Sequence, residues 1–345
     1  MTLYIGVDIH PYQQTVAYSD TMDGEIKFQT FKHKELEKLK KFYGSFKGDS
    51  AIVGVEATGG LEWFEEMIFD NGHKLLVGNP HEIRRRAMSR HKSDRRDAET
   101  ILDLLMKGEF PQVWRRDGQS RITLELLRFR QNIVRQRTSV ANQLQALARK
   151  QALPRFTVST KKGRNLLLTA KLSETDAWLR DSLCGLYDTL TERIGSVEER
   201  LRRLADGNEA AKQLMTHSGI GFRTALALTA TLGDVSRFGN MRQVTAFVGL
   251  DPLNKSTGEK QRIGRISKHG SRLCRHLLGQ AAARSQDKRI RAAYSRIKSR
   301  RGHAVAKVAA ARRILLNCYI MLRDGIDYAE FTRRGEVGLH EITLA

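Results

Sequence analysis

The feature that most constrains the fold is a row of apolar residues recurring every three or four positions between residues 179 and 204. The spacings along this row are 4, 3, 4, 4, 3, 4 and 3, and polar segments such as EERLRR occupy the other faces. This is the period that a helix needs in order to pack along a second helix. The row comprises Leu179, Leu183, Leu186, Leu190, Ile194, Val197, Leu201 and Leu204. It predicts a long helix with one packed side.

A second helical segment, residues 121–150, is the natural partner for that helix. Its apolar residues are Leu124, Leu127, Ile133, Val140, Leu144 and Leu147, and the segment LPRFTVSTKKGR follows near the expected bend. The pair predicts a coiled coil, either antiparallel within the chain or between two chains. A helix buried inside one domain is the alternative, but the polar flanks favour an exposed hairpin or a dimer arm.

The first 115 residues have a different texture, in which short β-rich runs alternate with helical stretches. The expected strands are LYIGVDI, QTVAYSD, EIKFQTF, AIVGVEA and HKLLVGNP, and the expected helices include HKELEKLKKFYGSF and GLEWFEEMIFDNG. Three strands in a meander, followed by alternating helices and strands, predict an α/β domain with a mixed sheet.

The fold class is therefore α/β plus all-α, and we expect four parts. They are an α/β domain at 1–117, a long-helix segment at 118–207, a helical domain at 208–325 and a tail at 326–345. The segment LMTHSGIGFRTALALTATLGD in the third part resembles a helix–hairpin–helix, with Gly219 and Gly221 in the hairpin. Such a turn can offer backbone N–H groups to a phosphate, although glycine turns between helices are common.

The charge of the chain indicates a polyanionic partner. Lys and Arg number 60 against 38 Asp and Glu, a formal net charge of +22. Residues 255–313 alone contain 18 Lys and Arg and two acids, which is hard to explain as a solvated surface because such a segment repels itself. The three dispersed cysteines indicate no metal site and no disulfide framework. With no secretion signal or membrane span in the sequence, we expect a cytoplasmic, nucleoid-associated protein.

Four carboxylates are placed where chemistry is expected. Asp8 and Glu56 each close an apolar strand, and Asp94 and Asp97 lie one helical turn apart in a basic stretch. Each acid alone could be a surface charge, and Asp94 alone would be read as a helix N-cap. Together, oxygen-only ligands without His or Cys favour a hard cation, Mg²⁺ or Mn²⁺. Two such ions could hold the attacking and leaving oxygens of a phosphodiester.

The segments GVDIH, VEATGG and HKSDRRDAETI, in this order, resemble the DEDD transposases of the insertion-sequence 110/1111 family and the Piv DNA invertases. The resemblance continues through SGIGFRTALALTATLGDVSRFGNMRQVTAFVGLDP and STGEKQRIGRISKHGSRLCRHLL, and so covers nearly the whole chain. It implies an RNase-H-like domain close to the RuvC resolvases, a coiled-coil middle and a C-terminal transposase domain. It also implies that Asp8, Glu56, Asp94 and Asp97 bind metal.

The resemblance further implies a C-terminal serine that attacks DNA and forms a covalent intermediate. The position of the family serine holds Thr257 here, and Ser256 precedes it; we expect Ser256 to attack, with Thr257 as the alternate. A second departure is Ser218 in the hairpin, where relatives typically have proline. Some relatives use a structured RNA encoded by their own element as a guide and act as dimers or tetramers, so guide RNA and homo-oligomers are expected partners beside DNA.

Cations around the expected nucleophile suit the clamping of a phosphate. They are Lys255, Lys260, Arg262, Arg265 and Lys268, and Arg289 and Arg291 extend the expected nucleic-acid surface. His10 could touch the metal but is read as a structural histidine. Glu99 and Asp103 are read as surface charges.

Three other functions compete with recombination. A non-catalytic nucleic-acid-binding protein could have kept the fold, and the Thr257 departure motivates this reading. A resolvase-like endonuclease could use water in place of a serine. An actin-like phosphotransferase could begin with IGVDIH, but that fold needs further glycine-rich phosphate loops, and EATGG is at most half of one.

Overall fold

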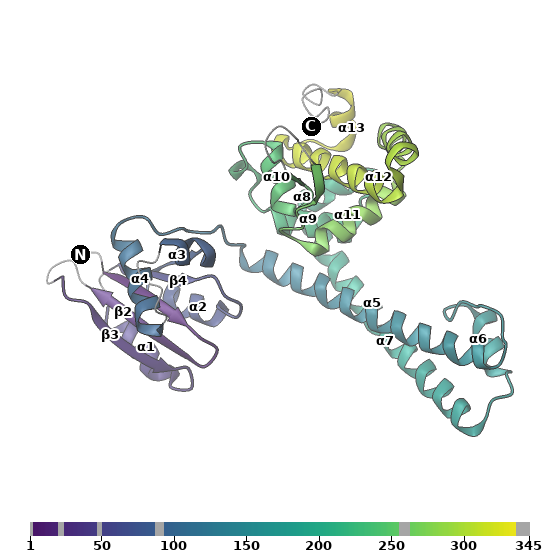
Figure 1. The fold of residues 1–345 in the computed structure, drawn as a ribbon, viewed down its shortest axis with the longest axis horizontal. Coiled ribbons are helices and arrows are strands. Elements are labelled where there is room, and N and C mark those ends of the chain that lie inside the picture. Colours follow the sequence, from purple (N-terminus) through teal and green to yellow (C-terminus); the bar gives the residue numbers. More distant parts are fainter. Residues whose placement is uncertain (1–2, 20–23, 47–49, 87–92, 255–262, 336–345) are drawn as a thin grey trace. The chain divides into compact units, whose positions relative to one another are not determined.

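The computed structural model describes residues 3–19, 24–46, 50–86, 93–254 and 263–335. Its internal contacts divide the chain into two compact units, Met1–Arg115 and Arg116–Ala345. Figure 1 shows the elements of each unit. None of the helices in the described ranges has the length and hydrophobicity of a membrane-spanning segment.

The first unit contains the predicted mixed sheet. The strands are β1 (Tyr4–Ile9), β2 (Gln13–Ser19), β3 (Lys27–Lys32), β4 (Ile52–Glu56) and β5 (Lys74–Gly78), in the order β3-β2-β1-β4-β5. The first three strands pair antiparallel, whereas β1 pairs parallel with β4 and β4 pairs parallel with β5. All five strands expected from the alternation of apolar and polar residues are confirmed.

The two faces of this sheet are covered differently. The helices are α1 (Leu36–Gly44), α2 (Glu62–Asp70), α3 (Pro80–Arg86) and α4 (Asp94–Met106). On one face Val7, Val53 and Val55 share a core with residues of α1 and α2, such as Leu39 and Phe64. The other face receives α4, which lies against β1, β2 and β4 (Figure 1).

Gly6 allows α4 to approach the sheet closely. A Cβ atom at this position would lie 2.3 Å from the backbone oxygen of Ala98 and 2.5 Å from the backbone nitrogen of Leu102. Gly54 leaves similar room on β4, because a Cβ there would lie 2.7 Å from Leu105 Cδ1. The glycines therefore fix which face α4 covers and how close it lies.

The second unit begins with a long antiparallel helical hairpin. Helices α5 (Gly118–Lys150) and α7 (Glu174–Asp206) pack against one another, and α6 (Lys161–Leu168) lies near the bend (Figure 1). Arg130 pairs with Glu198 at 2.6 Å and Lys150 pairs with Asp176 at 3.1 Å, so residue numbers rise along one helix as they fall along the other. The two predicted helices thus pair within the chain; a coiled coil between chains stays a prediction.

The apolar row of α7 is buried only in part, which corrects the sequence analysis. Ile194 and Leu201 are buried, but Leu179 is 37 % and Leu186 is 47 % exposed. Near the bend, Cys184 and Tyr187 are buried instead, in a cluster that includes Val158 and Leu167. The segment that contains α6 packs against α7 here, so the buried stripe shifts by one residue, which a pattern for two helices does not anticipate.

The remainder of the second unit is a helical bundle with a small β-ribbon. Its elements are α8 (Glu209–Met215), α9 (Phe222–Leu232), the 3₁₀ turn η1 (Val235–Arg237), α10 (Met241–Val248), β6 (Pro252–Asn254), β7 (Ile263–Ile266), α11 (Arg272–Arg284), α12 (Lys288–Asp324) and α13 (Tyr328–Arg333). Leu124 of α5 and Leu201 of α7 belong to its core, so the hairpin is anchored in the bundle at one end. Helix α12 is kinked at Gly302, whose φ is +82°.

Candidate metal centre and nucleic-acid surface

The alternation of strand side chains places two of the predicted acids on the face that α4 covers. Successive side chains of a strand point to opposite faces, so Asp8 points the same way as Gly6, and Glu56 the same way as Gly54. Both glycines face α4. Because β1 and β4 are parallel neighbours, the two acids emerge at the same edge of the sheet.

The other two acids lie in the first turn of α4. Ser93, and not Asp94, is the N-cap, because its hydroxyl accepts a hydrogen bond from the backbone N–H of Arg96. The reading of Asp94 as a cap is therefore wrong. Asp94 and Asp97 are helical residues whose negative charges lie favourably at the positive end of the helix dipole.

Asp8, His10 and Asp94 form a tight cluster. One ligand atom from each side chain lies within 4.8 Å of the other two, which is the spacing that donors around one cation require. Nε2 of His10 is 3.2 Å from Oδ2 of Asp8 and 3.4 Å from Oδ1 of Asp94. The other oxygen of Asp94 accepts a hydrogen bond from Gln13 Nε2 at 3.2 Å, which orients the carboxylate.

The electrostatics of Asp8 fit a cation-binding role. Burial of its carboxyl raises its pKa to about 6, and the nearby carboxylates of Asp97, Asp94 and Glu56 raise it too, whereas His10 lowers it. Within the described part of the chain, Oδ2 of Asp8 is buried without a hydrogen-bond partner, because the contact with His10 lacks hydrogen-bonding geometry. A divalent ion would supply the missing partner and remove the repulsion.

Glu56 and Asp97 lie near this cluster but outside its three closest ligands. Their charges act on Asp8, yet neither contributes an atom to the group that spans 4.8 Å. Oε1 of Glu56 accepts a hydrogen bond from Arg84 at 2.9 Å, and the Arg84 side chain is 73 % exposed. An exposed ion pair is weak, so an ion could displace Arg84 at small cost.

His10 is the residue that the sequence analysis undervalued. It follows β1 directly and lies two positions after Asp8, so the alternation that directs Asp8 toward α4 directs His10 there as well. The two-residue spacing between Asp8 and His10 was the sequence signal that could have identified His10 as a candidate ligand. Glu99 is exposed and Asp103 pairs with Lys107 at 2.7 Å, as expected for surface charges.

The expected nucleophile and several of its flanking cations lie outside the described residues. They are Lys255, Ser256, Thr257, Lys260 and Arg262. Arg265, on β7, and Lys268 are described and exposed. Lys268, Arg272 and Lys307 line a groove of about 490 Å³ that Ile266 of β7 also borders, so cations gather beside this ribbon.

The glycine hairpin packs against the protein on one side. Gly219 has a φ of +89°, and a Cβ there would lie 3.0 Å from the backbone oxygen of Ala281 and 3.0 Å from Cα of Ser285. Ser218, the departure from the family pattern, accepts a hydrogen bond from the backbone N–H of Gln286 through its hydroxyl at 2.7 Å. Close packing explains Gly219, whereas Gly221 is the N-cap of α9 and a Cβ added there would meet no atom within 4 Å. Phosphate binding by either glycine stays a prediction.

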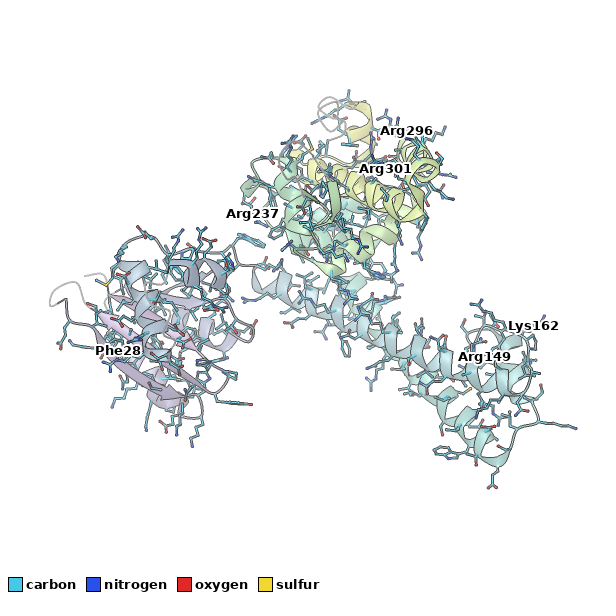
Figure 2. The ribbon with its side chains drawn as sticks, in the orientation of Figure 1. Phe28, Arg149, Lys162, Arg237, Arg296 and Arg301 are labelled. Carbon is cyan, nitrogen blue, oxygen red and sulfur yellow. The ribbon has the colours of Figure 1, made fainter. Side chains whose placement is uncertain are left out.

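The first part of α12 is rich in exposed cations. Its exposed basic residues are Lys288, Arg289, Arg291, Arg296, Lys298, Arg300 and Arg301. Figure 2 labels two of them, Arg296 and Arg301, on this helix. Ile290 is buried, whereas the exposed cations are distributed around the helix, with Arg289, Arg296 and Arg300 along one side and Arg291 and Lys298 on the opposite side. So many exposed cations suit the backbone of a nucleic acid.

Two stretches of the chain match models of transposase families. Residues 5–151 match the model of the DEDD transposases of IS110, described as "Transposase", and residues 211–295 match "Transposase IS116/IS110/IS902 family".

Three individual transposases are similar to this chain over about two thirds of its length. The transposase for insertion sequence element IS1328 of Yersinia enterocolitica is 31 % identical over 238 residues, which cover 67 % of this chain and 70 % of the relative. The transposase for insertion sequence element IS1111A of Coxiella burnetii is 28 % identical over 236 residues, 66 % of this chain and 63 % of the relative. A probable family 20 transposase of Pseudomonas aeruginosa is 28 % identical over 241 residues, 66 % of this chain and 69 % of the relative.

Proposed function

The chain belongs to the IS110/IS1111 family of transposases with an RNase-H-like DEDD domain, and from this premise we propose that it cuts and rejoins DNA strands through its carboxylate cluster. The observation that carries the proposal is the buried oxygen of Asp8, which has no hydrogen-bond partner among the described residues and faces the ligand atoms of His10 and Asp94. A surface carboxylate would be hydrated, whereas this oxygen is closed to solvent and its 3.2 Å contact with Nε2 of His10 is not a hydrogen bond, so it supports a metal centre.

A DEDD domain implies a divalent metal, and we propose Mg²⁺ or Mn²⁺, with two ions. Asp8 and Asp94 would hold the ion at the centre of the cluster, and Asp97 and Glu56 would complete the set. When bound, divalent ions stabilise the negative charge that develops on a phosphodiester. Gln13 keeps the carboxylate of Asp94 oriented, and Arg84 keeps that of Glu56 near the edge of the sheet.

For the attacking group, we propose the hydroxyl of Ser256, with Thr257 as the alternate. The hydroxyl would lose its proton as its oxygen forms a bond to phosphorus, and the bond from phosphorus to a deoxyribose oxygen would break. The leaving oxygen would take up one proton, and one strand end would stay joined to the protein through a phosphodiester. Rejoining would reverse these steps with a different deoxyribose hydroxyl. The exposed cations Arg265, on β7, and Lys268, which follows β7, support the proposal because they could bind the DNA phosphate that the hydroxyl attacks.

The test of the metal centre separates cutting from binding. Asp94→Asn keeps the size of the side chain and should abolish Mg²⁺-dependent cutting of the DNA ends that flank the gene, while DNA binding persists. Glu99→Gln removes an exposed acid from the same helix and should cut normally. Parallel loss of binding and cutting in Asp94→Asn, or normal cutting, would contradict the proposal.

The test of the nucleophile uses a denaturing gel. A protein–DNA adduct that disappears in a Ser256→Ala/Thr257→Ala double variant supports covalent chemistry. Cutting without any adduct, retained in the double variant, would show that water attacks. Binding with no cutting and no adduct would favour a non-catalytic nucleic-acid-binding protein.

We also propose that a structured RNA guides the chain and that two or four copies assemble through the helical hairpin. Exposed apolar residues on α7 support an assembly, since Trp178 is 67 %, Leu186 47 % and Leu179 37 % exposed. Leu179→Lys/Leu186→Lys should lower the mass measured by sedimentation, with or without the element's RNA. A mass equal to one chain in both variant and wild type would reject the assembly.

A further inference from the structure

An exposed aromatic side chain lies beside the carboxylate cluster. It is Tyr12, in the connection between β1, which ends at Ile9, and β2, which begins at Gln13. His10, at the start of this connection, contributes a ligand atom to the cluster, and Gln13 donates a hydrogen bond to Asp94. Tyr12 thus lies between two residues that contact the candidate metal ligands, yet the metal centre itself gives it no role.

The fold does not require an aromatic ring at this position. The Tyr12 side chain is 85 % exposed, and the next most exposed Phe, Trp or Tyr side chains in the described ranges are those of Trp178, at 67 %, and Phe69, at 56 %. Tight turns usually hold Gly, Pro, Asn, Asp or Ser, because these residues favour the backbone conformations of a turn. The ring of Tyr12 therefore contributes little to the stability of the sheet, and its surface is free to bind a partner.

Hydrogen bonds hold the backbone that carries this ring. The backbone N–H of His10 donates to the backbone oxygen of Gln13 at 2.8 Å, and the backbone N–H of His33 donates to the backbone oxygen of Tyr12 at 2.8 Å. Nδ1 of His33 lies 3.3 Å from the backbone oxygen of Pro11, which can only accept a hydrogen bond. The proline ring restricts the turn further. A side chain on a backbone held in this way loses less freedom when it binds, which favours affinity.

The ring is within reach of a strand bound at the metal centre. Two residues of chain span at most about 7 Å, so the Cα atom of Tyr12 is no farther than this from that of His10. Successive nucleotides of a duplex strand are separated by about 3.4 Å along the helix axis. If a phosphate is held at Asp8 and Asp94, the ring of Tyr12 is therefore only a few nucleotides from it.

A nucleic-acid base is the partner that suits this side chain. An exposed tyrosine standing alone needs no functional explanation, but here the exposure coincides with a held backbone and with the sheet edge that carries the candidate ligands. Every base offers an aromatic face, so stacking contributes to binding without requiring a particular sequence. The net charge of +22 also favours a polyanion over an apolar protein surface as the partner.

We propose that the ring of Tyr12 stacks on a base of the DNA strand whose phosphate is held at the carboxylate cluster, and so positions that strand for cutting. A base inside a duplex has both faces covered by its neighbours, so the strand is unstacked at the base that Tyr12 contacts. The inference rests on the proposed function for the identity of the strand.

The first test places a photoreactive group at this position of the full-length chain. Tyr12→p-benzoylphenylalanine is irradiated with the DNA ends that flank the gene and with RNA transcribed from them, and either the DNA or the RNA carries the label. We expect a covalent adduct with labelled DNA. Phe69→p-benzoylphenylalanine, at another exposed aromatic position of the same unit, should give little adduct. No adduct at position 12, equal yields at the two positions, or an adduct with RNA alone would overturn the proposal.

The second test separates stacking from proximity. All proteins carry Asp94→Asn, so that the DNA ends are bound but not cut, and their affinities are measured by titration. Tyr12→Ala should weaken binding by about tenfold, because the stack on one base is lost, whereas Tyr12→Phe keeps an aromatic ring and should bind normally. Phe69→Ala is the matched control and should bind normally as well. Equal affinities of the Tyr12→Ala and Tyr12→Phe proteins would show that no base stacks on the ring.

Failure of this inference is distinguishable from failure of the proposed function. If the wild-type chain cuts the DNA ends but forms no adduct at position 12, only the role of Tyr12 is refuted. If the DNA adduct forms at position 12 but the wild-type chain cuts no strand, the contact with the base stands and the proposed chemistry is refuted.

Discussion

Replacing Asp8 by Asn should stabilise the metal-free protein, although it should abolish metal binding. The pKa of Asp8 rises from 3.8 to about 6 in the folded chain, chiefly because burial disfavours the charged carboxylate. A raised pKa means that the folded state binds a proton more tightly than the unfolded state. Stability is therefore lost as the pH rises from about 4 to about 6.

The size of the stability difference follows from the pKa shift of Asp8. About two pKa units correspond to about 3 kcal/mol at 1.36 kcal/mol per unit, and the Asp8 side chain is only 14 % exposed, so solvent screens little of this energy. Asn carries no charge and keeps the shape. In EDTA, the advantage of Asp8→Asn over wild type should thus grow from about zero at pH 4 to about 3 kcal/mol above pH 7.

Hydrogen exchange followed by mass spectrometry measures this difference in stability within the first unit, Met1–Arg115. Backbone amides of β1 and β4 report the opening of the sheet in the full-length chain. Adding Mn²⁺ at pH 7.5 should slow exchange in wild type but not in Asp8→Asn, and Glu99→Gln should behave as wild type in both conditions. Faster exchange in Asp8→Asn than in wild type at pH 7.5 in EDTA would refute the reasoning.

Three further predictions concern a candidate metal ligand, the packing of α4 on the sheet and the cations of α12. His10→Ala should weaken Mn²⁺ binding by about 10-fold and Mg²⁺ binding less, because imidazole suits transition metals; calorimetry giving equal losses would count against a nitrogen ligand. Gly6→Ala should destabilise the first unit by about 3 kcal/mol or more, since its Cβ would meet the backbone of α4, whereas Gly59→Ala has open space and should melt normally. Neutralising Arg296 and Arg301 should lower the salt slope of DNA binding by about 0.9 per lost phosphate contact, and an unchanged slope would place these side chains away from DNA.

The sheet and the edge that carries the candidate metal ligands could be predicted from the sequence, because the alternation of apolar and polar residues is a local signal. Each strand follows from its own apolar run, and the glycine two positions before each strand-end acid, Gly6 before Asp8 and Gly54 before Glu56, marks the face on which a helix lies close. That face decides that Asp94 can reach Asp8, and the packing of α4 then brings His10 into the same group.

Features that depend on a third partner could not be read from local patterns. The heptad row predicts burial of Leu186, but the segment carrying α6 packs beside α7 and selects Tyr187 instead. Likewise, Nδ2 of the buried Asn317 in α12 lies 3.3 Å from Nε2 of His217, one hundred positions earlier in the chain. Contacts between residues so far apart in the chain leave no periodic pattern in the sequence.

The most direct test of the metal centre is anomalous diffraction from crystals of the chain grown with Mn²⁺. We predict a strong anomalous peak at bonding distance from Oδ2 of Asp8 and from an oxygen of Asp94, with Nε2 of His10 turned toward it. A fully ordered cluster with no peak at saturating Mn²⁺, or a peak bound only by other side chains, would contradict the account.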